Sequence, residues 1–289
     1  MPRLRPLYRD FDAQAQIDAQ YNPSIGLAAG VNPGDHYARQ AEVARKLRCM
    51  LDVPYGPTVH ETLDIFPADQ PNAPVFVFIH GGYWRAFGSY DFHGIALGLQ
   101  PLGITTVVVN YALAPRVNID EITRQTRAAA AWTLRNIAQY GGDPTRVGIG
   151  GHSAGGHLTA MCLQTAWADD YGLPQDPFKA ALLFSGLYDI EPLRYSYLQP
   201  MIQLDDGIVR RNSPAFGVRA CKTPIWITWG GNETTEFARQ SSNYHAAWNM
   251  AGNTSELRPI DGADHFTVIH GLEQRDSEVS RWLAQQLKA

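Results

Sequence analysis

Residues 149–156 read I-G-G-H-S-A-G-G and place the pattern G-x-S-x-G between two segments of different periodicity. The β-branched Val147 and Ile149 precede the pattern, and an apolar, helix-like segment follows at residues 158–167. A strand that turns sharply into a helix needs small residues two positions before and after the turning serine, so that the two elements can pass closely. A glycine-rich turn with an incidental serine is the alternative. In this context, the stretch predicts that the Ser153 hydroxyl is exposed on a tight strand–helix turn.

Apolar runs alternate with helical segments along most of the chain. The expected strands cover residues 60–66, 75–79, 105–109, 147–149, 180–184, 224–229 and 256–260. The expected helices cover residues 10–21, 36–50, 119–140, 158–167, 236–250 and 273–287. This alternation predicts an α/β fold with a mostly parallel, twisted sheet and helices on both faces, with a small cap or none. We expect one domain, residues 1–289, with residues 1–50 as a helical N-terminal extension packed on it.

Two of these strands differ in pattern. Residues 75–79 are continuously apolar, as expected of a strand that is buried on both faces. Residues 60–66 alternate between polar and apolar side chains, which predicts a half-exposed strand at the sheet edge. In parallel sheets, binding and catalytic residues usually lie at the carboxyl ends of the strands, and the polar and glycine-rich clusters of this chain follow its expected strands.

Composition and charge limit the kind of partner. The chain has 45% hydrophobic and 18% charged residues, as in ordinary globular proteins, and its net charge of −4 argues against nucleic-acid or membrane partners. Three widely spaced cysteines (Cys49, Cys162 and Cys221) indicate reduced thiols and a cytoplasmic location. No signal peptide or run of 18 apolar residues is visible. We expect a small-molecule substrate, and the sequence does not decide between a monomer and a homodimer.

A serine nucleophile needs a base, and the base needs an orienting carboxylate. His265 is the expected base because it follows the last expected strand in a tight loop, where the chain order serine, acid, histidine would place it. His270 comes later, where a helical turn could already form, and is expected to be structural. The sequence therefore pairs Ser153 with His265.

The acid should follow the strand at 224–229. Glu233 lies in that loop and is the favoured residue, whereas Glu236 is expected to start the next helix, where its charge suits the helix dipole. Asp189, one strand earlier, is the rival acid. Asp264, beside the histidine, is expected to point away.

The segment H-G-G-Y-W at residues 80–84 follows a buried strand. The N–H groups of Gly82 and Tyr83, together with that of Ala154, are the expected oxyanion hole. His80 and Gly81 are expected to support this loop rather than to take part in proton transfer.

Aromatic residues crowd the same loop. We expect Trp84 and Phe87, together with Phe266, to contact the substrate, leaving room for only a small acyl group and an aromatic wall for the leaving group. The alternative is that Trp84 and Phe87 are core residues that steady the loop. The metal-protease, phosphate-loop and dinucleotide-binding sequences are all missing, so we expect no metal and no cofactor.

These motifs resemble the α/β-hydrolase superfamily, and within it the kynurenine formamidase (arylformamidase) branch. The segments that carry the resemblance are H-G-G-Y-W at 80–84, Y-A-L-A-P at 111–115, G-H-S-A-G-G-H-L at 151–158, S-G-L-Y-D-I-E-P-L at 185–193, N-S-P at 212–214, E-T-T-E-F-A-R-Q-S at 233–241 and D-H-F at 264–266. Hormone-sensitive-lipase-like esterases would show H-G-G-G and G-D-S-A-G-G, from which Tyr83, Trp84 and His152 depart.

The resemblance implies Ser153 as nucleophile, His265 as base and Glu233 as acid, although family members often carry aspartate at the acid position. It implies hydrolysis of N-formyl-L-kynurenine to L-kynurenine and formate, a step of tryptophan catabolism. The motifs leave open a short-chain carboxylesterase that uses the same machinery. A non-catalytic binding protein with this fold is a third hypothesis.

Kynurenine also carries an amino-acid carboxylate. Arg85, Arg194 and Arg210 are candidates for binding it, by location alone.

Overall fold

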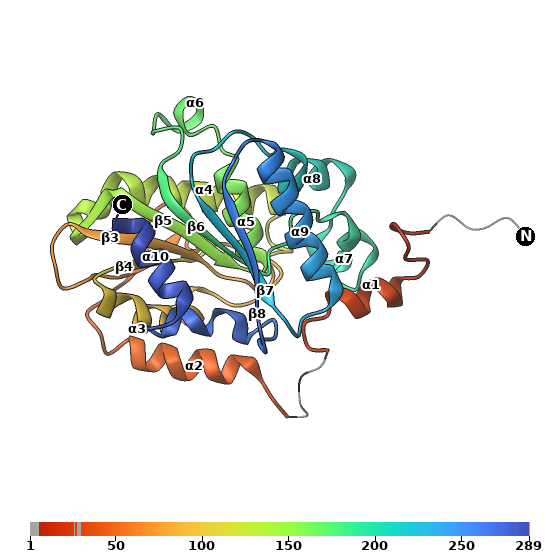
Figure 1. Cartoon of the computed structure of the whole chain (residues 1–289), viewed down its shortest axis with the longest axis horizontal. Helices are drawn as coiled ribbons and strands as arrows, with labels where there is room; N and C mark the ends of the chain where they lie inside the picture. The colour runs from red at the N-terminus through yellow and green to blue at the C-terminus, as the bar shows by residue number, and fades with distance from the viewer. Residues whose placement is uncertain (1–5, 26, 28–29, 289) are drawn as a thin grey trace, which may run out of the picture.

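The computed structural model describes residues 6–25, 27 and 30–288, and an eight-stranded sheet lies at its centre (Figure 1). The strands stand in the order β1-β2-β4-β3-β5-β6-β7-β8. Their bounds are β1 Met50–Pro54, β2 Thr62–Phe66, β3 Ala73–Ile79, β4 Thr105–Val109, β5 Gly142–His152, β6 Phe178–Phe184, β7 Ile225–Gly230 and β8 Ser255–Ile260. Strands β3 to β8 pair in parallel, whereas β1 and β2 are antiparallel additions. The expected α/β fold with a mostly parallel sheet is confirmed.

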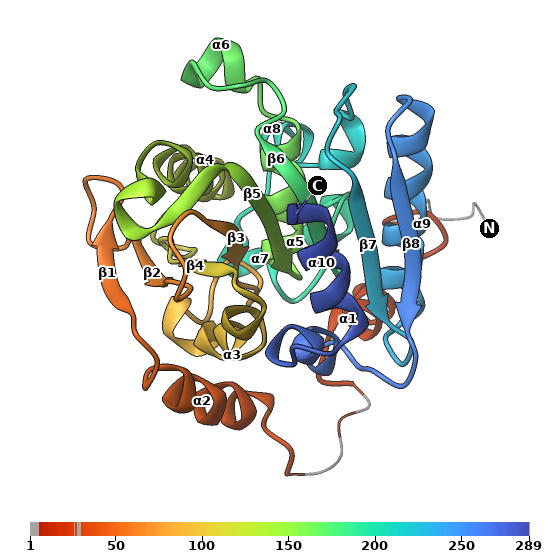
Figure 2. The ribbon, with the colours of Figure 1, turned by 60° about the vertical axis from the view of Figure 1, so that its left-hand side comes forward.

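Helices cover both faces of this sheet. The bounds of the α-helices are α1 Gln14–Tyr21, α2 Pro33–Ala44, α3 Ala96–Leu99, α4 Ile119–Asn136, α5 Ala154–Leu163, α6 Trp167–Tyr171, α7 Gln199–Ile202, α8 Asp206–Arg211, α9 Thr235–Met250 and α10 Glu278–Lys288. Figures 1 and 2 show α4, α5 and α9 on one face and α2, α3 and α10 on the other. The sheet is therefore the middle layer of three.

Two apolar cores result from this layering. Along β3, Val75, Val77 and Ile79 pack into the core under α4 and α5, whereas Phe76 and Phe78 pack into the core under α3 and α10. Successive side chains of a strand point to opposite faces, so a strand covered on both sides must be apolar throughout. This explains the uninterrupted run at 75–79.

The N-terminal part of the chain differs from its expected structure. The helix expected over residues 36–50 ends at Ala44, and Met50 instead begins β1. Strand β1 lies outside β2, so residues 60–66 are not the edge of the sheet. The polar residue that suggested an edge, Asp64, is buried and accepts hydrogen bonds from His93 Nε2 at 2.8 Å and from the Asp52 N–H at 2.9 Å.

Helices α1 and α2 belong to opposite cores, with Tyr21 in one and Tyr37 in the other. On the α1 side, the Thr234 hydroxyl donates to the Gln20 carbonyl at 2.5 Å and the Tyr197 N–H donates to Asp18 at 2.7 Å. The N-terminal extension is thus tied to the loops that follow β6 and β7.

Strand register brings the carboxyl ends of the central strands together. Ile79 of β3 pairs with Gly151 of β5, and His152 pairs with Phe184 of β6. The loops after β3, β5, β6, β7 and β8 therefore meet at one edge of the sheet. Among the described residues, no helix is long and apolar enough to cross a membrane, and the three cysteines are not joined by disulfides.

Candidate active site

Ser153 lies on the sharp turn between β5 and α5. Its backbone has φ 57° and ψ −117°, a conformation that is strained for a residue with a side chain. A Cβ at Gly151 would lie 2.3 Å from the Gly155 carbonyl oxygen, and one at Gly155 would lie 1.9 Å from the carbonyl oxygen of Ile79. Both contacts are with backbone, so the turn requires glycine at both flanking positions.

His265 and Glu233 form a buried pair behind this turn. Nδ1 of His265 lies 2.7 Å from Oε2 of Glu233. The other carboxylate oxygen accepts hydrogen bonds from the Ser185 hydroxyl and from the Gly230 N–H, the latter at 2.6 Å. Because an ionised carboxylate can only accept, the proton of the neutral imidazole sits on Nδ1, and Nε2 is left as the basic nitrogen.

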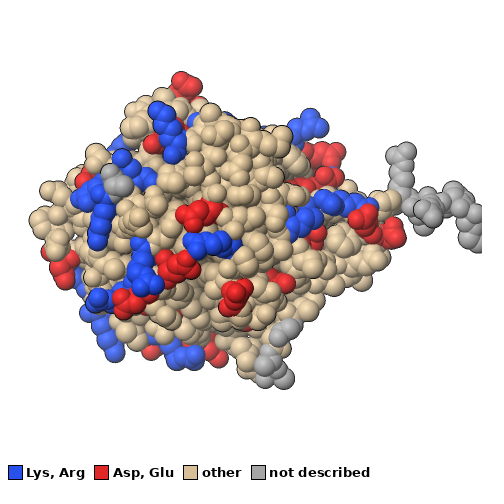
Figure 3. Space-filling model, in the orientation of Figure 1, with Lys and Arg blue, Asp and Glu red and all other residues tan. Residues whose placement is uncertain are grey.

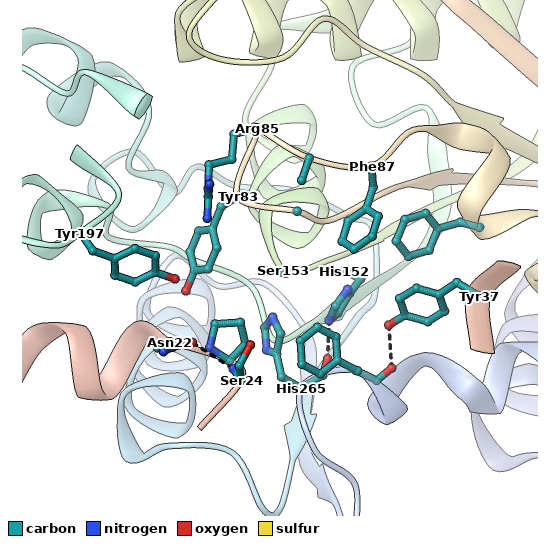
Figure 4. Close-up of a pocket in the computed structure, with 15 residues that line it drawn as sticks. Asn22, Ser24, Tyr37, Tyr83, Arg85, Phe87, His152, Ser153, Tyr197 and His265 are labelled. Atoms are coloured by element: carbon teal, nitrogen blue, oxygen red, sulfur yellow. Dashed lines mark hydrogen bonds between the residues drawn. The ribbon is translucent and has the colours of Figure 1, made fainter. Parts of the chain in front are cut away.

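Ser153 and His265 line the same cavity, and Figure 4 shows the imidazole directed toward the serine. The side-chain hydrogen bond that this imidazole makes is the one to Glu233. Within the described residues, none joins it to the Ser153 hydroxyl. Hydrogen bonds between catalytic groups are often long in ligand-free enzymes and tighten when substrate binds. The structure therefore brings Ser153, His265 and Glu233 together at the cavity. The hydrogen bond between the Ser153 hydroxyl and the His265 imidazole is the one contact that still has to form.

The competing acidic residues have other partners. Asp189 accepts a hydrogen bond from the Tyr8 hydroxyl at 2.7 Å, and Glu236 holds the Arg239 guanidinium at 2.6 Å. Asp264 accepts a hydrogen bond from the backbone N–H of Phe266 at 2.9 Å and so shapes the turn around His265. Packing thus selects Glu233 among the four carboxylates.

His270 also lies away from the serine. Its ring stacks on that of His36 with the centroids 3.8 Å apart, and burial lowers its pKa to about 4. This is the structural position that was expected.

The loop after β3 reaches Ser153 from the other side. A Cβ at Gly81 would lie 3.2 Å from Cβ of Ser153, so this loop passes directly over the turn. Gly82 and Tyr83 have positive φ values of 104° and 49°. In the described part of the structure, the N–H groups of Gly82, Tyr83 and Ala154 donate no hydrogen bond. All three are therefore available to an oxygen that becomes negative beside Ser153.

His80 anchors this loop from below. Its Nδ1 donates to the Gly81 carbonyl at 2.8 Å, and its ring stacks on Tyr111 at 4.1 Å. The Tyr111 hydroxyl returns a hydrogen bond to the His80 carbonyl at 2.9 Å. Burial lowers the pKa of His80 to about 4, so this imidazole is neutral at physiological pH. The position is that of a scaffold.

His152 connects the Ser153 turn to the loop that carries His265. Its Nε2 donates to the backbone carbonyl of His265 at 2.7 Å, and the two rings lie 4.7 Å apart. Burial lowers the pKa of His152 well below its ordinary value, so the ring is neutral. In the sequence, His152 stands out only as a departure from the esterase pattern. No spacing in the sequence shows that residues 152 and 265 touch.

A cavity of about 240 Å³ opens beside Ser153, which is small for a ligand site. One part of its wall is aromatic: Tyr37, Phe87, Phe92 and Phe266. Another part is polar: Asn22, Ser24, Tyr83, Arg85 and Tyr197. In Figure 4, Phe87 and Tyr37 lie on one side of Ser153, and Arg85, Tyr83 and Tyr197 lie on the other. The cavity thus has an aromatic end and a polar end, with the serine between them.

Trp84 is a correction to the expected substrate contacts. Its side chain is completely buried, does not line the cavity, and donates Nε1 to Nδ1 of His157 at 3.3 Å. The core alternative therefore holds for Trp84. Phe87 and Phe266 do line the cavity, and their contact with a substrate stays a prediction.

Several lining residues were not expected. Asn22, Pro23, Ser24 and Tyr37 come from the N-terminal extension, and Tyr197 comes from the segment between β6 and β7. In the sequence the first three indicate only a chain break. Among the described residues, no group of three or more His, Cys, Asp or Glu side chains could hold a metal ion.

The site has the arrangement of serine hydrolases on a parallel α/β sheet, in which the nucleophile, the acid and the base each follow a different strand, in that order along the chain. Here Ser153 follows β5, Glu233 follows β7 and His265 follows β8. The chain belongs to the α/β-hydrolase-fold family, whose model matches residues 76–269.

Named relatives and solved structures agree with this assignment. A kynurenine formamidase of Salmo salar is 30% identical over 85% of each chain. An esterase of Mycobacterium tuberculosis, LipQ, is 27% identical over 88% of this chain and 62% of its own. The crystal structure of a putative thioesterase from Silicibacter has a TM-score of 0.81 and 26% identity, covering 95% of this chain and 99% of its own. The expected fold and resemblance are confirmed, and the protein is a hydrolase.

Proposed function

We propose that this hydrolase is an arylformamidase that converts N-formyl-L-kynurenine to L-kynurenine and formate. The observation that carries the proposal is the small cavity at Ser153, which has an aromatic wall on one side. A formyl group needs almost no acyl pocket, whereas the aromatic amine that departs needs an apolar surface of this kind. The relatives named kynurenine formamidase support the same substrate.

The first half of the reaction uses the buried pair. Nε2 of His265 takes the proton of the Ser153 hydroxyl as its oxygen attacks the formyl carbon. Glu233 keeps the imidazole in the required tautomer and stabilises the imidazolium, without itself taking the proton. The N–H groups of Gly82, Tyr83 and Ala154 hold the oxyanion of the tetrahedral intermediate, and each such donor contributes about 3 kcal/mol.

The second half releases the two products. His265 passes its proton to the departing aryl nitrogen, and the carbon–nitrogen bond breaks. Kynurenine departs, and Ser153 then carries the formyl group as an ester. A water molecule, deprotonated by His265, then attacks the ester carbonyl. Formate leaves as the proton returns to Ser153, and the enzyme is restored.

A short-chain carboxylesterase is the second candidate. The similarity to the esterase LipQ favours it, and the same groups would act on an ester with alkoxide as leaving group. The two candidates differ in what must fit at the serine. An esterase for longer acyl chains needs space for them, whereas a formamidase does not.

A substrate comparison tests the proposal. We would measure kcat/KM for N-formyl-L-kynurenine, p-nitrophenyl acetate and p-nitrophenyl butyrate, with Ser153→Ala as the inactive control. The proposal expects the formyl amide to be preferred and the butyrate to be rejected. Faster turnover of butyrate than of the formyl amide would instead assign an esterase.

The proposal includes a cytoplasmic location and a small-molecule substrate, without a nucleic-acid or membrane partner. Three unpaired cysteines support the location. Figure 3 shows positive and negative side chains interspersed on the face in view, which supports the absence of a polyanion-binding surface there. Cell fractionation with an antibody to the protein tests the location, and recovery in a secreted or membrane fraction would contradict it.

A further inference from the structure

Arg85 is the one residue with a fixed charge among the described residues that line the cavity. It follows the oxyanion loop directly, and its N–H donates to the Gly82 carbonyl at 3.0 Å. This hydrogen bond fixes the backbone of Arg85 relative to the groups around Ser153. Figure 4 shows its side chain at the polar end of the cavity, beside Tyr83.

The Arg85 guanidinium has no carboxylate partner within ion-pair distance in the described part of the chain. The other two candidate arginines differ. Arg194 is paired with Asp206, and Arg210 lies on α8 and does not line the cavity, although it is exposed as Arg85 is. The structure therefore separates three residues that the sequence could not rank.

The surroundings of Arg85 suit an anion. Burial raises the pKa of the Tyr197 hydroxyl, so that Tyr197 stays neutral beside the cation, and this hydroxyl makes a long hydrogen bond of 3.4 Å to the Tyr21 carbonyl. The Tyr83 hydroxyl is already used, donating to the Tyr21 carbonyl at 2.5 Å. No acidic residue lines the cavity among the described residues, so an incoming carboxylate meets no like charge there. Arginine binds carboxylates strongly because two parallel N–H groups can hold both oxygens.

We propose that Arg85 binds a carboxylate on the leaving group of the substrate and thereby selects anionic aryl amides over neutral ones. This inference rests on the proposed function. In N-formylkynurenine the amino-acid chain is attached to the ring next to the scissile amide. The ring can therefore occupy the aromatic end while the carboxylate reaches the polar end.

The test compares substrates that differ in this carboxylate. N-formyl-L-kynurenine is paired with 2′-formamidoacetophenone, which keeps the ring, the ketone and the formyl amide but lacks the amino-acid group. The ratio of their kcat/KM values is the readout. In Arg85→Gln this ratio should fall about ten- to hundredfold, mainly through KM, because a charge-assisted hydrogen bond is lost.

Two further variants show whether the change in the ratio comes from the charge of Arg85 or from the loss of any surface arginine. Arg210→Gln removes an exposed arginine that lies outside the cavity and should leave the ratio as in the wild type. Arg85→Lys keeps the charge and should restore part of the ratio. A ratio that is unchanged in Arg85→Gln, or that falls equally in Arg210→Gln, would overturn the assignment.

An ester pair, 3-acetoxybenzoate and phenyl acetate, keeps the two proposals distinguishable. If the wild-type enzyme leaves both formyl amides intact, the proposed function fails. Carboxylate binding by Arg85 is then tested with the two esters alone. A preference for the anionic ester that Arg85→Gln abolishes would support carboxylate binding, and equal rates on the two esters would refute it.

Discussion

Replacing Glu233 by glutamine should abolish most turnover while leaving the fold intact. In the native site one carboxylate oxygen accepts from Ser185 and Gly230, and the other accepts from Nδ1 of His265. A glutamine has only one oxygen, which the first two donors would hold. Its amide NH₂ would then face Nδ1 and require that nitrogen to be unprotonated. The proton would sit on Nε2, which could no longer take the proton of Ser153.

The size of the effect follows from this change of tautomer. In serine proteases the corresponding acid-to-amide change lowers kcat about 10⁴-fold, or roughly 5 kcal/mol of transition-state stabilisation. We expect a loss of this order in initial-rate assays on N-formyl-L-kynurenine or p-nitrophenyl acetate. The control is Asp189→Asn, which alters the rival acid and should leave kcat within a fewfold of wild type. A Glu233→Gln enzyme that keeps a tenth of its kcat would show that Glu233 does not orient His265, and an inactive Asp189→Asn enzyme would point to Asp189 instead.

The remaining predictions concern stability. Gly155→Ala should lower the free energy of unfolding in urea by about 3 kcal/mol or more, because the new Cβ would meet backbone at 1.9 Å. Gly148→Ala, whose nearest contact is a leucine side chain at 3.2 Å, should cost far less, and equal costs would contradict this account. Buried His80 and His157 have pKa values lowered to about 4, so below pH 6.5 the unfolded chain binds protons that the folded chain does not. Stability should be fully present above pH 6.5 and fall by about 2 kcal/mol per histidine at pH 5; urea unfolding that is unchanged between pH 7.5 and pH 5 would disprove this.

The parallel strands could be predicted because burial on both faces leaves an unbroken apolar run. The strand at 105–109 coincides with β4. Strand β1 gives no such signal, since it lies at the edge of the sheet and two of its five residues are only partly buried while the rest are exposed. Local periodicity reports how a segment is covered, and an edge strand is hardly covered at all.

The candidate site was predictable as far as chain order determines it. Ser153 and His265 each follow a strand in a position that few other residues share. The choice of acid depends on packing, because Asp189 also follows a parallel strand, but Asp189 contacts Tyr8 whereas Glu233 contacts His265. The aromatic residues show the same limit. Trp84 and Phe87 lie in one loop with positive φ values, and that backbone sends one side chain into the core and the other into the cavity.

The part of the cavity wall that the N-terminal extension supplies could not be predicted from the sequence. Asn22, Pro23 and Ser24 are ordinary turn residues, and only the position of α1 against α9 places them at the cavity. The position of Arg85 at the cavity is likewise not indicated by the sequence, because an arginine in a loop is usually a solvated surface charge. Its position at the cavity became visible only in three dimensions.

Every step of the proposed reaction depends on Ser153 as the nucleophile. The most direct measurement treats the active protein with a fluorophosphonate and maps the covalent adduct by mass spectrometry. We expect one phosphonyl group on Ser153, loss of activity in step with labelling, and no labelling of Ser153→Ala. An adduct on another residue that accompanies inactivation, or full activity in Ser153→Ala, would contradict it.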